Sequence, residues 1–257
     1  MITSLTNPKI KHIIGLRKRA KTRKEERLFI IEGLRMFEET PDVLLDEVYV
    51  TKSFYDSYND KKKLKNVHAE VVSDEVFMKM SDTVSPQGII ASVKCLSYRE
   101  SEVVKENGFL LLLEDIQDPG NLGTLIRTAE GAGIDAVILS KGCVDIYSPK
   151  VIRSTMGAIY RMPFVMVEFM PQYIKYLREK HFKVYAAALG YDTDYTKADY
   201  SRSVAVTIGN EGNGLTKESI NAASGVVTIP MSGKLESLNA AVSGAILMYE
   251  GRRQREK

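Results

Sequence analysis

The chain has 257 residues, of which 44% are hydrophobic and 27% charged. This composition allows one large domain or two smaller ones with buried cores, and it excludes a disordered, collagen-like or disulfide-stapled chain. The net charge of +3 is unevenly distributed, because residues 1–35 hold ten Lys and Arg against three Glu and the rest of the chain is therefore acidic. Such a basic segment predicts a polyanionic partner, since Lys and Arg displace counterions from phosphates. The alternative is a basic helix that faces solvent without a partner.

The cysteine and hydropathy patterns predict a cytoplasmic protein. Cys95 and Cys143 lie far apart and outside any CxxC pattern, so neither a disulfide nor a zinc site is expected. The N-terminus lacks the apolar segment of a signal peptide, and apolar runs such as residues 109–113 are far too short to cross a bilayer. We therefore expect a soluble protein without a membrane association.

Residues 1–97 are predicted to form a small α/β domain. Apolar side chains recur at helical spacing between positions 10 and 16, which predicts an amphipathic helix with a basic outer face. Short strands are expected at 28–31, 47–50, 68–72 and 88–93, with a helical stretch near 33–39. The polar segment 97–102 then joins this domain to the rest of the chain.

Residues 105–257 are predicted to form a second domain, in which strands and helices alternate. Strands are expected at 109–113, 136–139, 161–167, 183–188, 204–209 and 226–229. Helices are expected at 121–131, 149–156, 172–180 and 216–222, and from Leu235 to about Arg252. Apolar strands that alternate with helices predict an α/β fold with a parallel sheet covered on both faces.

Three loops follow strands of this predicted sheet, at the edge where open α/β sheets bind ligands. The first, residues 114–123, contains a Pro119-Gly120 turn followed by Asn121, which is suited to cap the next helix. Capping does not account for Arg127, which lies more than one turn into a mostly apolar helix.

The second loop, residues 208–215, has three glycines within six residues directly after an apolar strand. Glycines at this density permit positive φ angles and a close approach of the backbone to a ligand. The G-x-x-G-x-G spacing is not the dinucleotide fingerprint, and no Lys-Ser or Lys-Thr pair follows as in a P-loop. The spacing therefore argues against a nicotinamide-dependent oxidoreductase and against a kinase.

The third loop, residues 229–239, leads into an alanine-rich helix. Ser237 and Asn239 flank Leu238 near the start of this helix, as helix caps or as polar groups of a small-molecule pocket. The three histidines lie outside all three loops, so no hydrolytic triad and no metal site is expected.

Together and in this order, the loops resemble the three signature motifs of the SpoU (TrmH-type) group of the SPOUT superfamily of RNA methyltransferases. The motif residues are 118–129, 208–215, and 229–231 with 237–242. The resemblance covers about residues 105–253, and residues 1–97 are similar to the ribosomal-protein-like substrate-binding domain that often precedes this fold. The N-terminal similarity depends on residues 7–9, 29–33 and 87–88.

The resemblance implies a trefoil-knotted SPOUT domain that pairs as a homodimer and transfers a methyl group from S-adenosylmethionine to a ribose 2′-oxygen of structured RNA. The cofactor-binding residues that it implies are Leu189, Gly209, Asn210, Glu211, Gly214, Ile229, Met231 and Leu238. The catalytic residues that it implies are Asn121, Arg127, Glu211, Ser237 and Asn239. No metal is required for this displacement.

Arg127 is the family's usual candidate for activating the hydroxyl, and the resemblance lets it act at the cofactor of the partner subunit. Because a guanidinium is effectively never deprotonated in proteins, we expect Arg127 to grip a phosphate or the developing alkoxide. Glu211 as a general base stays open. Large-subunit ribosomal RNA is the favoured substrate, with transfer RNA, or a non-catalytic RNA-binding assembly protein that retains the fold, as alternatives.

Overall fold

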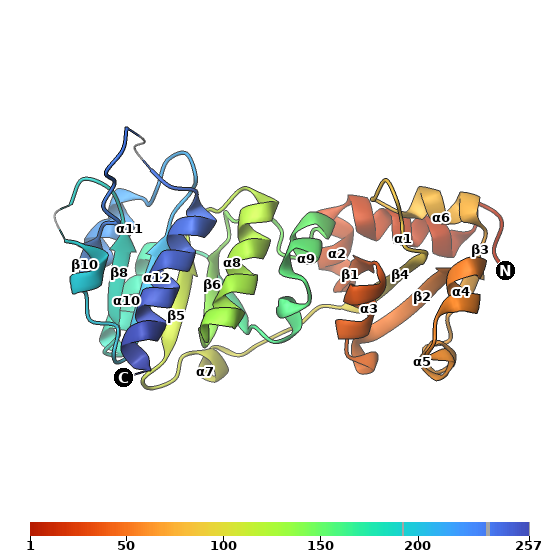
Figure 1. Cartoon of the computed structure of the whole chain (residues 1–257), viewed down its shortest axis with the longest axis horizontal. Helices are drawn as coiled ribbons and strands as arrows, with labels where there is room; N and C mark the ends of the chain where they lie inside the picture. Colours follow the sequence, from red (N-terminus) through yellow and green to blue (C-terminus); the bar gives the residue numbers. More distant parts are fainter. Residues whose placement is uncertain (192, 235–236, 257) are drawn as a thin grey trace. The chain divides into compact units, whose positions relative to one another are not determined.

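The computed structural model describes residues 1–191, 193–234 and 237–256, and the chain divides into two compact units. The N-terminal unit comprises residues 1–96 and also residues 145–160. The C-terminal unit comprises residues 97–144 and 161–257. Figure 1 shows the elements of both units along the chain.

The N-terminal unit is a four-stranded mixed sheet with the strand order β1-β4-β2-β3. Strand β4 pairs antiparallel with both β1 and β2, and β3 pairs parallel with β2. The strands are β1 (Leu28–Glu32), β2 (Leu45–Thr51), β3 (Glu70–Val72) and β4 (Ile89–Lys94). The helices are α1 (Pro8–Lys18), α2 (Ala20–Glu26), α3 (Leu34–Glu39), η1 (Asp42–Leu44), α4 (Lys52–Ser57), α5 (Lys61–Asn66), α6 (Asp74–Met80), α9 (Pro149–Thr155) and η2 (Ala158–Tyr160).

The basic N-terminal segment forms two helices and then a strand. Asn7 caps α1 through a hydrogen bond of 2.9 Å from the backbone N–H of Lys9 to its side chain, and α1 ends where Arg19 adopts an extended conformation. The apolar spacing correctly predicts the buried face of α1, where Ile10, Ile13 and Leu16 are fully buried.

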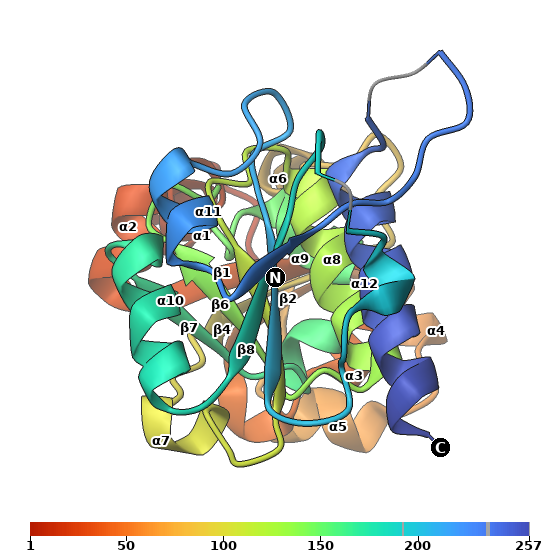
Figure 2. The ribbon, with the colours of Figure 1, turned by 90° about the vertical axis from the view of Figure 1, so that its left-hand side faces the viewer.

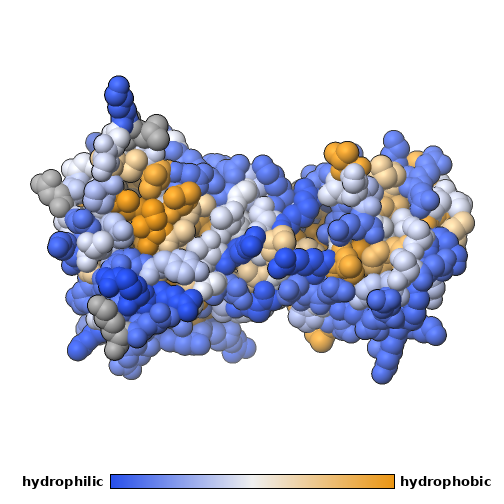
Figure 3. Space-filling view, in the orientation of Figure 1, coloured by the Kyte–Doolittle hydropathy of each residue, from blue (hydrophilic) through white to orange (hydrophobic). Residues whose placement is uncertain are grey.

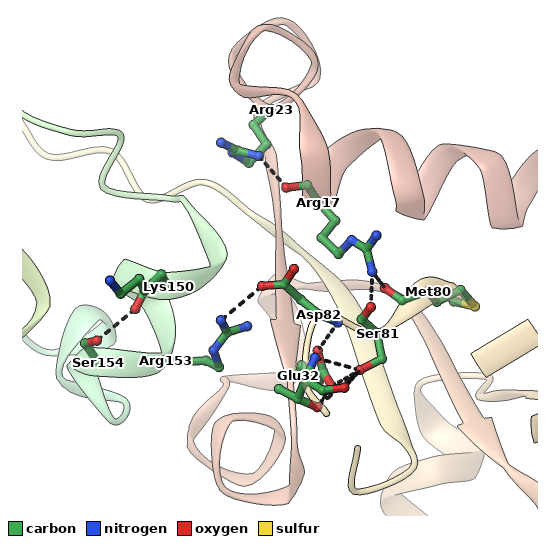
Figure 4. Close-up of polar contacts among 10 residues, drawn as sticks. Arg17, Arg23, Glu32, Met80, Ser81, Asp82, Lys150, Arg153 and Ser154 are labelled. Atoms are coloured by element: carbon green, nitrogen blue, oxygen red, sulfur yellow. Dashed lines mark hydrogen bonds and ion pairs between the residues drawn. The ribbon is translucent and has the colours of Figure 1, made fainter. Parts of the chain in front are cut away.

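Residues 145–160 follow β6 of the C-terminal unit in sequence, and they were expected to belong to that unit. In the structure this segment packs in the N-terminal unit, where α9 contacts β1. The buried guanidinium of Arg23 donates to Asp145 Oδ2 from Nε at 2.9 Å and from Nη2 at 2.5 Å. Arg153 Nη2 donates to Asp82 Oδ2 at 3.0 Å (Figure 4). The side chains of Val151 and Ile152 are fully buried, and their burial further stabilises the packing of this segment.

The C-terminal unit is a six-stranded, entirely parallel sheet with the strand order β10-β8-β9-β5-β6-β7. Helices α8 and α12 cover one face and α10 and α11 the other (Figure 2). The strands are β5 (Phe109–Leu113), β6 (Ala136–Ser140), β7 (Phe164–Val167), β8 (Lys183–Ala187), β9 (Val204–Ile208) and β10 (Gly225–Val227). The helices are α7 (Glu100–Val103), α8 (Pro119–Ala132), α10 (Met170–Glu179), η3 (Tyr195–Lys197), α11 (Lys217–Ala222) and α12 (Ala240–Arg255).

The parallel strands are buried on both faces, as their continuous apolar runs predict. All five residues of β5, of β6 and of β9 are buried. Helix α12 begins at Ala240, later than expected, and Leu235 lies outside the described residues. Helix α12 lies close to α8 because Gly244 has no side chain: a Cβ there would meet Leu125 Cδ2 at 2.4 Å.

Candidate active site

A pocket of about 380 Å³ opens at the carboxyl edge of the parallel sheet, within the size range of small-molecule sites. All eight expected cofactor-binding residues, and Ser237, line it. The further lining residues are Ala187, Ala188, Ile208, Gly212, Asn213, Leu215, Ile220, Val227, Ala240 and Ser243. Tertiary structure thus brings the ends of β8, β9 and β10 together with the start of α12.

The loop after β9 is closed into a ring by two backbone hydrogen bonds between Asn210 and Gly214. The backbone N–H of Asn210 donates to Gly214 O at 3.1 Å, and the N–H of Gly214 donates to Asn210 O at 2.9 Å. Inside the ring, Asn210 Oδ1 accepts the N–H groups of Gly212 and Asn213. Gly209 is required here, because a Cβ would lie 2.3 Å from the carbonyl carbon of Gly214. The glycine spacing therefore shapes the pocket wall through the backbone.

The first loop differs from the expectation in one respect, because Asn121 does not cap α8. Asp118 is the cap, and its Oδ1 accepts the N–H of Asn121 at 2.8 Å. The Asn121 side chain is therefore available for other contacts: Nδ2 donates to Glu211 Oε1 at 2.9 Å, and Oδ1 accepts Nδ2 of Asn239 at 2.9 Å. One hydrogen-bonded chain thus joins the three sequence motifs.

Glu211 is held by donors on both carboxylate oxygens. Besides Asn121, the backbone N–H groups of Gln117 and Asp118 donate to it at 3.2 Å each. Partial burial of the carboxyl opposes ionisation, but the hydrogen bonds from Asn121 and from backbone N–H groups outweigh this effect and lower the pKa of Glu211. A carboxylate with a depressed pKa that already accepts several hydrogen bonds is a weak proton acceptor. The geometry therefore favours a structural role for Glu211, in which it holds the first and second loops together, over the role of a general base.

Asn239 combines the two functions that the sequence left open. Its Oδ1 accepts the N–H of Ala241 at 2.9 Å and thereby caps α12, while its Nδ2 bonds Asn121. Ser237 lines the pocket two residues earlier. Helix α12 therefore begins at the pocket, with its N-terminal end fixed to the other two motifs.

Arg127 lies apart from these residues. It is exposed on α8, is absent from the pocket lining, and makes no hydrogen bond or ion pair with any residue that the structure describes. Gly131 lies one turn after Arg127 on the same face of α8. A Cβ added at Gly131 would lie 3.6 Å from the Tyr249 hydroxyl, so this face of α8 lies beside α12. Arg127 therefore does not line the pocket of its own chain.

Sequence reasoning missed Glu114, which is buried at the end of β5. Its carboxylate accepts hydrogen bonds from the backbone N–H of Thr216 at 3.0 Å, from the Thr216 hydroxyl at 2.9 Å and from the Ser219 hydroxyl at 2.6 Å. These bonds fix the start of α11 directly after the pocket-lining Leu215. The sequence did contain an indication of this role, because Glu114 directly follows five apolar strand residues, and a carboxylate buried at such a position needs hydrogen-bond partners.

The pocket residues fit S-adenosylmethionine. The lining of the pocket includes the apolar side chains of Leu189, Ile229, Met231 and Leu238, which suit a flat apolar ring such as adenine, and the backbone of the glycine loop. Among the residues that the structure describes, no three His, Cys, Asp or Glu side chains are grouped so that they could hold a metal ion. Within the same residues, no helix has the length and apolar character needed to span a bilayer.

The model of the SpoU rRNA Methylase family matches residues 108–249, which is more than half of the chain. The chain belongs to the SpoU rRNA methylase family. The model of the MRM3-like substrate binding domain matches residues 7–91 of the N-terminal unit. The resemblance that the motifs indicated and the α/β fold class with its parallel sheet are thereby confirmed.

Relatives match over nearly the whole chain. The 23S rRNA (guanosine(2553)-2′-O)-methyltransferase RlmP of Bacillus subtilis is 32% identical over 251 residues, which cover 96% of this chain and 97% of the relative. The AdoMet-bound rRNA methyltransferase of Sinorhizobium meliloti superposes with a TM-score of 0.86 at 29% identity, covering 98% of this chain and 97% of that chain. An RNA 2′-O ribose methyltransferase superposes with a TM-score of 0.80 at 31% identity, covering 100% and 99%.

This member of the SpoU rRNA methylase family is therefore an RNA methyltransferase that uses S-adenosylmethionine. The individual roles of the pocket residues, the trefoil knot and the homodimer stay predictions.

Proposed function

We propose that the protein methylates a ribose 2′-hydroxyl of large-subunit ribosomal RNA. The observation that carries the proposal is the hydrogen-bonded chain from Glu211 through Asn121 to Asn239, which joins all three motifs beside a pocket of cofactor size. The 23S rRNA 2′-O-methyltransferase RlmP, with its near-complete coverage of this chain, supports the substrate class. We propose that the protein acts in the cytoplasm, where it would meet ribosomal RNA.

The reaction is an in-line displacement by a ribose oxygen, which loses its proton to solvent water as it takes the methyl group. S-adenosylmethionine, when bound, supplies a methyl group on a sulfonium that leaves as a neutral thioether. The task of the protein is to orient the hydroxyl and to weaken the hold on its proton. We assign Ser237, Asn239 and Asn121 to orientation of the ribose, because they provide neutral polar groups at or beside the pocket. Glu211 holds Asn121 and the first loop in position.

We further propose that the enzyme is a homodimer in which Arg127 enters the pocket of the partner subunit. An apolar stripe on α12, made of exposed Val242 and Tyr249 with half-buried Ala245 and Ile246, lies beside the face of α8 that carries Arg127. Figure 3 shows this apolar area over the first turns of α12. A contiguous exposed apolar area beside an unpaired arginine suits a subunit interface. There a guanidinium can grip a phosphate or the developing alkoxide.

The N-terminal unit supplies the RNA-binding surface in this proposal. The cations of residues 1–35 fall into two groups, because Lys9, Arg17, Lys21 and Arg23 are bound by acceptors within the unit. The other group makes no hydrogen bond or ion pair with the described residues and is exposed: Lys11, Lys18, Arg19, Lys24, Arg27 and Arg35. These six are free to contact phosphates.

Two measurements test the proposal. The first is a thermal shift, in which S-adenosylhomocysteine should raise the melting temperature and NAD and ATP should not. The second is sequencing-based mapping of 2′-O-methyl sites in total RNA from strains with and without the protein, which should show one site lost from large-subunit ribosomal RNA. A site lost from transfer RNA would transfer the assignment to that substrate. Loss of no site, with the cofactor bound, would indicate a non-catalytic assembly protein.

A further inference from the structure

Two exposed side chains with large apolar surfaces lie on the loop between β8 and η3. Leu189 is 51% exposed although it lines the pocket, and Tyr191 is 45% exposed. Gly190 separates them and has a φ of +80°, which allows the chain to turn between them. Two residues span at most about 7 Å, so the Tyr191 backbone lies close to the pocket opening.

The ends of this loop are firmly attached. Ala188 donates its N–H to Val227 O at 3.1 Å, and its carbonyl accepts the Thr228 hydroxyl at 2.7 Å. The N–H of Thr228 donates to Thr193 O at 2.8 Å. Residues 227 and 228 directly precede Ile229, which lines the pocket. The side chain of Tyr191 therefore projects from a loop whose two ends are fixed beside the pocket.

Tyr191 also differs from the other tyrosines of the described chain. Only Tyr191 and Tyr249 appear among its exposed large hydrophobic side chains. Tyr249 belongs to the apolar stripe assigned above to the subunit interface. Tyr191 makes no hydrogen bond, ring stack or cation-π contact with any residue that the structure describes, whereas Tyr185, nearby on β8, bonds Asp199 and contacts the ring of Tyr200. An aromatic ring without a partner at a pocket opening is suited to contact a ligand.

We propose that Tyr191 stacks on the nucleobase whose ribose is methylated, with Leu189 packing beside it. The inference rests on the proposed function, because it needs an RNA nucleotide at the pocket. A ribose buried in stacked, paired RNA is difficult to reach, and proteins recognise unstacked bases by stacking them on aromatic side chains. Such stacking is sequence-tolerant, so Tyr191 is a positioning residue that holds the splayed nucleotide while other groups select the RNA.

The test uses the full-length protein and the RNA identified by methyl mapping. Tyr191→Ala should reduce kcat/KM for that RNA by about tenfold, within the range of stacking losses on alanine substitution, and Tyr191→Phe should keep most of it. Calorimetric affinity for S-adenosylmethionine and the melting temperature should stay parental in both variants. Phe169→Ala is the matched control, because Phe169 is 61% exposed and follows β7, at the other end of the sheet.

A direct readout of stacking is available because the chain contains no tryptophan. In Tyr191→Trp, the single indole should be quenched by the RNA, and Phe169→Trp should change little. Parental kcat/KM in Tyr191→Ala, or an unquenched indole in Tyr191→Trp, would overturn the stacking role while leaving the methyltransferase activity intact. An equal loss in Tyr191→Phe and Tyr191→Ala would also overturn it. A parent protein that methylates no RNA would instead contradict the proposed function.

Discussion

Glu211 Oε1 lies 2.9 Å from Nδ2 of Asn121, and this contact connects a loop after β9 with the start of α8, ninety residues earlier in the chain. Its carboxylate also accepts two backbone N–H groups of the first loop. These contacts indicate that Glu211 holds the first and second motifs together. This structural role can be separated experimentally from that of a general base.

Glu211→Gln should lower cofactor affinity and stability together. The pKa of Glu211 is depressed in the folded protein, so the carboxylate contributes stability above its unfolded pKa and loses that contribution as the pH falls through the folded value. At pH 7 we expect a loss of about 1 kcal/mol or less, because the group is partly solvated. The difference between parent and variant in urea unfolding should shrink below about pH 5. Unchanged cofactor affinity with a large fall in turnover would favour the general base instead.

Arg127→Ala should leave the fold intact and remove most of the methyl transfer. The side chain is exposed and has no partner among the described residues, so stability should change by less than about 0.5 kcal/mol. Loss of a charged group at the reacting centre should reduce turnover on the order of 10²-fold. Arg127→Lys should restore little of this activity, because the ammonium of lysine cannot reproduce the planar, bidentate hydrogen bonding of a guanidinium. Single-turnover methylation at the parental rate would show that Arg127 is a surface residue.

Tyr249→Glu should convert the proposed dimer to a monomer of 28.8 kDa in light scattering. A carboxylate in the middle of an apolar interface is left without a partner when the subunits meet, so association becomes unfavourable. Activity should fall with dimer content, because each pocket then lacks the partner's arginine. Phe169→Glu changes another exposed aromatic residue, outside the apolar stripe of α12, and should stay dimeric. A parent protein that is already monomeric at micromolar concentration would contradict the dimer.

Replacing Lys18, Arg19 and Lys24 with Gln should weaken RNA binding and its salt dependence. Lys18 ends α1, Arg19 joins α1 to α2, and Lys24 lies on α2. All three side chains are exposed and unpaired among the described residues. Three lost phosphate contacts should make the slope of log K against log salt less negative by roughly 2. The control replaces Lys105, Lys175 and Lys197, which are exposed on the C-terminal unit, with Gln. An equal change in slope in both triple variants would show that no particular surface binds the RNA.

A fragment of residues 105–257 should be aggregation-prone. Residues 145–160 pack with the N-terminal unit, and the fragment would expose the apolar side chains of Ile146, Val151, Ile152 and Ile159. Soluble mass in size-exclusion chromatography measures the effect. Val151→Lys with Ile152→Glu in the fragment should recover solubility. A well-behaved parental fragment would show that this segment refolds onto its own unit.

The sequence by itself determined the alternation of strands and helices, the two-part organisation and the family. Strand positions such as 109–113 agree with the structure because continuous apolar runs bounded by turn residues have few other stable arrangements. The three motifs were readable because close backbone approach requires glycine at positions such as Gly209, where an added Cβ would collide with the backbone of Gly214.

Tertiary structure decided which groups meet. Asp118 rather than Asn121 caps α8, although both residue types are good caps. The Asn121 side chain is placed by Glu211 and Asn239, which lie 90 and 118 residues further along the chain. Likewise, the apolar pattern of residues 149–156 shows that this helix buries one face but does not indicate against what. The surface that covers it lies in the N-terminal unit, where Arg23 finds Asp145, and such a pairing depends on three-dimensional proximity that periodicity does not encode.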